Sequence, residues 1–200
     1  NAVSYSPGLT YSRDKNTDFG KAVEMAADAD VILYFAGEEA VLSGEAHSRA
    51  DITLPGSQTE YLRALAATGK PVVTIIMAGR PLAIPEECQL SRAVLYSFHP
   101  GTMGGPALVN VLSGDAAPGG RLPVCMPRMS GQMPLYYACK STGRPTSEMT
   151  LIDDIPLEAG QTSTGCTSFF LDAGYEALFP FGYGLGYTTF EYGIPVLSAT

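Results

Sequence analysis

The sequence predicts an α/β protein in which helices lie on both faces of a doubly wound, mostly parallel sheet, a flavodoxin-like α/β sandwich. Short apolar runs rich in β-branched and aromatic residues, each ended by glycine, alternate with amphipathic segments along the chain. A continuous apolar run is typical of a strand buried on both faces. Strands that alternate with helices favour parallel pairing through right-handed crossovers.

The strands are predicted at the apolar runs themselves. They are residues 31–37 (VILYFAG), 71–79 (PVVTIIMAG) and 93–101 (AVLYSFHPG). Residues 121–127 (RLPVCMP) predict a further strand, and residues 2–8 (AVSYSPG) are a second possible addition to the sheet.

The helices are predicted from apolar residues that recur every three or four positions. These stripes are Phe19, Ala22, Val23 and Ala26, then Leu62, Leu65 and Ala66, then Leu108, Val111 and Leu112. Ser57 and Glu60 have the spacing of a capping box, and Gly69 suits the end of that helix. Pro106 suits a first helical turn and Gly114 a helix end.

Composition narrows the partners that this chain can bind. With 200 residues, 46% of them hydrophobic, we predict one domain over residues 1–200, in which 128–187 form long loops and an aromatic, glycine-rich C-terminal segment. A net charge of -8 argues against binding nucleic acid or an anionic membrane surface. The four cysteines are too scattered for a structural zinc site, and they allow three pairings or a reduced state.

The glycines of "FGYGLGY" near the C-terminus do not predict a nucleotide site. Gly182, Gly184 and Gly186 are spaced in a way that invites that interpretation, but no strand and helix flank them.

The segment from Gly37 to Pro55 is the strongest functional signal. It is much longer than the roughly 2 to 6 residues usual for such a connection, and it leaves the carboxyl end of a predicted strand, where open α/β folds bind ligands. It carries Glu38, Glu39, Glu45, His47, Arg49 and Asp51. The alternative is a solvated surface loop. A single histidine, His47 here or His99 later, is more often structural than catalytic.

Several long stretches resemble glycoside hydrolase family 3, especially its bacterial periplasmic β-glucosidase branch. They are "GEEAVLSGEAHSRADITLPGSQTEYLRALAATGKPVVTIIMAGRPLAI", "PGTMGGPALVNVLSGDAAPGGRLPVCMPR", "YYACKSTGRP" and "LFPFGYGLGYTTFEY". The likeness covers nearly the whole chain and keeps the family's order.

The resemblance implies a six-stranded sandwich domain that follows an N-terminal (β/α)8 barrel and often precedes a fibronectin type III-like domain. The chain contains neither neighbour, and its final "TTFEYGIPVLSAT" resembles the lead-in to the latter. The resemblance further implies a β-glucoside or oligosaccharide substrate, no cofactor or metal, and a periplasmic or secreted location.

The resemblance also assigns roles to residues of the long loop. A retaining glycosidase needs two carboxyls about 5 to 5.5 Å apart. The family's aspartate nucleophile lies on the barrel, and "SGEA" places the general acid/base at Glu45. Arg49, His47 and Ser43 would contact substrate or support the loop, with Arg49 bracing it through a carboxylate or carbonyl. Glu38 and Glu39 are weaker alternatives for the acid because they lie close to the strand end.

Several alternatives also fit the sequence. The chain departs from the family at Met103, Gly186 and Phe169, and Phe169 would affect what binds beyond the cleaved bond. Some members take their acid from the barrel, although the "SGE" loop argues against that branch. The competing functions are a β-xylosidase or other family 3 glycosidase and, in another class, a non-catalytic carbohydrate-binding module.

Overall fold

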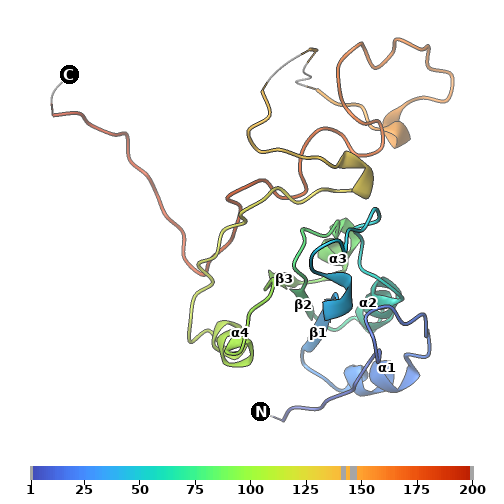
Figure 1. Ribbon diagram of the computed structural model, residues 1–200, viewed down its shortest axis with the longest axis vertical. Coiled ribbons are helices and arrows are strands. Elements are labelled where there is room, and N and C mark those ends of the chain that lie inside the picture. The colour runs from blue at the N-terminus through green and yellow to red at the C-terminus, as the bar shows by residue number, and fades with distance from the viewer. Residues whose placement is uncertain (1, 141–142, 145–147, 199–200) are drawn as a thin grey trace.

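The centre of the molecule is a parallel three-stranded sheet. The computed structural model describes residues 2–140, 143–144 and 148–198, and in them β1 (Ile32–Gly37), β2 (Val72–Met77) and β3 (Ala93–Tyr96) pair in the order β1-β2-β3 (Figure 1). Ile32 pairs with Val72 and Gly37 with Met77 at the two ends of the first ladder, and Val73 pairs with Ala93 in the second. The carboxyl ends of the strands therefore lie at one edge.

Helices lie on both sides of this sheet, as predicted. Helices α1 (Gly20–Ala27), α2 (Gln58–Ala66) and α3 (Pro85–Leu90) lie on one side, and α4 (Gly104–Ser113) lies on the other (Figure 1). The most deeply buried side chains lie between the first three helices and the sheet, or in the segment that enters α3; they include Leu62, Val72, Ile76, Leu82 and Ile84. This α/β sandwich confirms the predicted fold class.

The helix boundaries confirm most of the local signals. Gly114 ends α4 in the left-handed conformation with φ 86°, and Pro106 lies in the first turn of that helix. The capping box was wrong, because the Ser57 hydroxyl makes no cap hydrogen bond to α2. It donates instead to the carbonyl oxygens of Asp14 at 3.0 Å and Asn16 at 2.5 Å.

Two of the predicted strands do not form. Residues 121–127 lie antiparallel to residues 178–183 through bonds such as Leu122 N to Tyr183 O at 2.8 Å and Met126 N to Phe179 O at 2.9 Å, but only a single bridge results. Pro123 and Pro127 lack the amide hydrogens that a continuous ladder needs. Residues 2–8 are irregular and largely exposed, with no strand beside them among the described residues.

The second face of the sheet is less buried than the continuous apolar runs predicted. Leu33 and Phe35 of β1 remain 46% and 49% exposed, although Ile75 in the central strand is fully buried. The reason is that α1, α2 and α3 cover the side to which Tyr34 and Ala36 point.

The described part of residues 128–187 contains no strand of the sheet and two single turns of 3-10 helix, η2 (Ser130–Gln132) and η3 (Ile152–Asp154); a third such turn, η1 (Ala40–Leu42), follows β1. The "GYG" glycine Gly184 has a packing role, because a Cβ there would lie 2.4 Å from the Gly120 carbonyl oxygen. In "YYACKSTGRP", residues 141, 142 and 145 lie outside the described residues. Within the described chain, no helix has the length and apolar character needed to cross a bilayer.

Candidate functional site

The long loop after β1 and the short loop after β2 meet at the carboxyl edge of the sheet. The first runs from Glu38 to Ser57, and the second passes through Gly79 and Arg80. The chain beyond β3 adds His99 to the same edge, since the His99 imidazole Nε2 lies 3.4 Å from the Ser43 hydroxyl. Parallel α/β sheets bind ligands at this edge.

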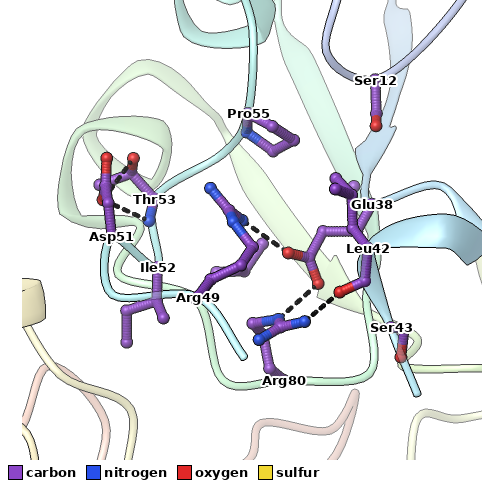
Figure 2. A network of polar contacts seen from close by, with 12 residues as sticks. Ser12, Glu38, Leu42, Ser43, Arg49, Asp51, Ile52, Thr53, Pro55 and Arg80 are labelled. Carbon is purple, nitrogen blue, oxygen red and sulfur yellow. Dashed lines mark hydrogen bonds and ion pairs between the residues drawn. The ribbon is translucent and has the colours of Figure 1, made fainter. Parts of the chain in front are cut away.

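Glu38 is the buried centre of this region. Its side chain has no exposed surface, and both oxygens bind guanidinium groups. Arg49 Nη1 donates to Oε1 at 2.5 Å, and Arg80 Nε donates to Oε2 at 2.8 Å (Figure 2). Such charge-assisted bonds offset the cost of burying the carboxylate. Glu38 therefore has neither a free oxygen nor an open path to a ligand.

Arg80 reaches further than this ion pair. Its Nη2 donates to the backbone carbonyl oxygen of Leu42 and, at 3.0 Å, to that of His47. These two carbonyls stand on either side of residues 43–46. The sequence analysis missed Arg80, although its place directly after the predicted strand 71–79 was a usable signal.

Glu45 occupies the tip of a tight turn. The turn closes through His47 N donating to Gly44 O at 3.1 Å, and Gly44 and Ala46 have φ values of 121° and 64°. A left-handed alanine costs about 1–2 kcal/mol, so surrounding contacts must hold the turn. The Glu45 side chain is exposed, and no described residue forms a hydrogen bond or ion pair with its carboxylate.

Ser43 and His47 differ in how closely they join this site. Ser43 is half-buried and contacts His99, whereas the His47 side chain is exposed. A Cβ at Gly79 would lie 2.4 Å from His99 Nε2 and 3.1 Å from the Ser43 hydroxyl, so glycine leaves the room for that contact.

Gln58 is a second residue that the sequence analysis missed. Its amide is buried, accepts from Gly37 N at 2.8 Å, and donates to the carbonyl oxygens of Gly37 at 2.8 Å, Pro55 at 3.0 Å and Ser12 at 3.0 Å. It therefore binds both backbone groups of the residue before Glu38. The neighbouring Ser57, which has the spacing of a capping box with Glu60, is the more conspicuous polar residue of "PGSQTE".

The two remaining acids of the loop have structural partners. Glu39 pairs with Arg13 of the N-terminal segment. Asp51 accepts from Thr53 N at 3.0 Å and from the Ser130 hydroxyl at 3.1 Å, which connects the loop to η2. Hydrogen bonds from the Thr53 backbone and hydroxyl lower the pKa of Asp51.

Other predicted residues lie away from the loop. Phe169 is half-buried and Met103 is exposed before α4, and the structure shows no contact that brings either to Glu45. Gly186 packs near the Pro118 carbonyl oxygen. Among the described residues, no group of three histidine, cysteine, aspartate or glutamate side chains is arranged to hold a metal ion.

The fold and this edge define a parallel α/β domain with a braced acidic loop, and comparison with known proteins gives its family. Residues 2–187 match the glycosyl hydrolase family 3 C-terminal domain. The chain belongs to this family.

Relatives in the family include glucosidases and xylosidases. The chain is 42% identical over 179 residues to the periplasmic beta-glucosidase of Salmonella typhimurium, covering 90% of this chain and 22% of that protein. It is 34% identical over 198 residues to a beta-xylosidase of Formosa agariphila, covering 99% and 25%. The crystal structure of a beta-glucosidase from Listeria innocua in complex with isofagomine superposes with a TM-score of 0.74 at 35% identity, over 86% of this chain and 22% of that one. The chain thus spans about a quarter or less of these relatives.

Proposed function

We propose that this chain is the second catalytic domain of a retaining exo-β-glucosidase and that Glu45 is its general acid/base. The observation that carries the proposal is the contrast among the loop glutamates. Glu38 and Glu39 are paired with arginines, whereas Glu45 projects from a tight turn with its carboxylate unengaged by the described residues. Only a carboxyl that leaves its own domain surface can reach a substrate held by another domain.

The chemistry divides into two steps. Glu45 gives its proton to the glycosidic oxygen as the bond to the anomeric carbon breaks, while a carboxylate from another domain attacks that carbon. Glu45, now a carboxylate, then takes a proton from water as the water displaces the enzyme carboxylate. The nucleophile is an aspartate of an N-terminal (β/α)8 barrel, and a fibronectin type III-like domain follows.

Two neighbouring residues would support the acid. Arg49 braces the loop through Glu38 rather than binding sugar, since its guanidinium is bonded to that carboxylate at 2.5 Å. Ser43 holds the start of the turn through His99. His47 is exposed beside Glu45 and is left to contact substrate or the partner domain.

A β-xylosidase is the second candidate, favoured by the Formosa agariphila relative that matches 99% of this chain. The sugar is selected mostly by the barrel. A periplasmic location agrees with the name of the Salmonella typhimurium relative. A non-catalytic binding module, the candidate from another class, has less support, because a binding loop does not need one unpaired carboxyl held on a strained turn.

Replacing Glu45 tests the proposal in the full-length enzyme. Glu45→Gln should reduce kcat/KM for cellobiose-like substrates by about 10²- to 10⁴-fold, because an alcohol leaves poorly without a proton. Hydrolysis of an aryl glucoside with a dinitrophenolate leaving group should keep a nearly normal first step. Added azide should restore turnover and yield the β-glycosyl azide, detected by NMR.

Glu39→Gln is the matched control, because it makes the same change at a glutamate already paired with Arg13. It should leave the dependence on leaving group unchanged. Equal losses on both substrates for Glu45→Gln, with no azide product, would place the acid elsewhere and remove the basis of the proposal.

A further inference from the structure

We infer that Arg80 is a positioning residue for the general acid, holding Glu45 in place through the backbone on both sides of its turn. The inference rests on the proposed role of Glu45. Arg80 lies in the loop after β2, 35 positions from Glu45 along the sequence. Its described contacts do not include Glu45 itself, so it would act on Glu45 only through the backbone.

One guanidinium makes three contacts that belong together. Nε binds the buried Glu38 carboxylate at 2.8 Å, and Nη2 binds the Leu42 carbonyl before the turn and the His47 carbonyl after it, the latter at 3.0 Å. Figure 2 shows the side chain aimed between the Glu38 carboxylate and the Leu42 carbonyl. The planar fork of arginine supplies donors in fixed directions, which the single ammonium of lysine does not.

Arg80 is itself held by the sheet. The Tyr96 hydroxyl at the end of β3 donates to the Arg80 carbonyl oxygen and accepts from Leu82 N at 3.2 Å. Burial raises the pKa of Tyr96 to about 12, so this hydroxyl keeps its proton through the neutral range. The Arg80 side chain is 20% exposed. The contacts of the Arg80 guanidinium with Glu38, Leu42 and His47 therefore link the turn that carries Glu45 to β2 and β3.

Among the described residues, the side-chain contacts that flank the turn are those of Arg80 with the Leu42 and His47 carbonyls and that of Ser43 with His99. Ala46 stands at φ 64°, a conformation that alanine avoids, and the turn is closed by one backbone hydrogen bond at 3.1 Å. Arg49 braces the segment that follows the turn, because it lies two residues after His47 and binds Glu38. Without Arg80 the two carbonyls would turn to water, and a displacement of about 1 Å at a reacting group costs roughly a hundredfold in rate.

Arg80→Lys in the full-length enzyme tests the inference. We expect kcat/KM to fall about 10- to 100-fold for cellobiose-like substrates and less than about threefold for the dinitrophenyl glucoside, whose leaving group needs no proton. In a Glu45→Gln background the same change should have almost no further effect, since a residue that acts through Glu45 has nothing left to position. Arg63→Lys is the control; that arginine binds Glu86 with two nitrogens on the exposed side of α2 and α3.

The outcomes distinguish a positioning role for Arg80 from a merely structural one. Covalent trapping by a 2-fluoro dinitrophenyl glucoside counts the folded active sites without needing an acid, and should be unchanged. Reduced trapping, equal losses on both substrates, or a full effect in the Glu45→Gln background would make Arg80 a merely structural residue and overturn the inference. If Glu45→Gln itself shows no dependence on leaving group, the proposed function has failed first.

Discussion

At the scale of single residues, three glutamates on one loop show how surroundings decide what a carboxyl can do. The Glu38 side chain is fully buried and pairs with two arginines, and Glu39 pairs with Arg13. The Glu45 side chain is exposed to solvent. Buried charges in proteins are paired because an unpaired one costs several kcal/mol. Of the three, only the proposed acid, Glu45, has a carboxylate that the described residues leave free to meet a substrate.

The cysteines illustrate the same rule for thiols. All four are unpaired; Cys88 on α3 is half-buried, and Cys139 is exposed. Burial, with the neighbouring Glu87 charge, raises the pKa of Cys88 to about 11. Since the thiolate is the reactive form, iodoacetamide at pH 8 should label Cys139 first and Cys88 about a hundredfold more slowly. Raising the pH toward 11 should narrow the difference.

Peptide mass spectrometry measures both rates in one sample, and labelling in denaturant is the control, where the two thiols should react alike. Equal rates at pH 8 in the folded protein would show that Cys88 is not shielded as the structure indicates.

At the scale of elements, the loop between β1 and α2 is held at both ends and braced in the middle. Gln58 binds Gly37 and Pro55 at its two ends, Arg80 spans the centre, and Ile52 and Leu54 are buried in the core. The N-terminal segment completes this support, because Ser57 N donates to Asp14 O at 2.8 Å. A functional loop of this length keeps its form only because the elements around it supply the hydrogen-bond partners.

Two glycines allow this support to be measured. Gly56 has φ 66°, and a Cβ there would lie 2.4 Å from Asp14 O and 2.7 Å from Arg13 C, whereas Gly69 has φ 76° with open space. Gly56→Ala should lower the free energy of unfolding by about 3 kcal/mol through strain and collision, and Gly69→Ala by about 1 kcal/mol through strain alone. Denaturant unfolding compares them. Equal losses would mean that residues 13–14 do not press against the loop.

At the scale of the whole molecule, the sheet and the C-terminal segment leave apolar surface uncovered. Leu33 and Phe35 on β1 are about half-exposed, and Phe190 and Tyr192 in the segment that runs away from the body in Figure 1 are 72% and 92% exposed. Exposed apolar groups of this extent are typical of surfaces that contact other protein. The match covers only 22% of the Salmonella typhimurium relative, so that protein has further segments beside this domain.

The proposed division of catalysis between domains predicts how the 200-residue chain should behave alone. The 200-residue chain should not hydrolyse aryl β-glucosides, since the nucleophile of the proposed mechanism is a carboxylate of another domain. The assay follows release of nitrophenolate, with circular dichroism showing that the helices and sheet have formed. Turnover by the folded chain that Glu45→Gln abolishes would contradict the division of labour.

The sequence by itself determined the three strands, helices α1, α2 and α4, and the place of the long acidic loop. These features could be predicted because the hydrophobic period and the positions of glycines are local properties of the chain. The sequence also carried the family resemblance that the comparison confirmed. Only the tertiary structure decided that Ser57 binds residues 14 and 16 instead of capping α2, that residues 121–127 form no strand, and that Arg80 and Gln58 hold the loop. The physical reason is that Arg80 meets Glu38 across 42 positions of sequence, and a contact between distant residues depends on how the strands pack, which no local pattern contains.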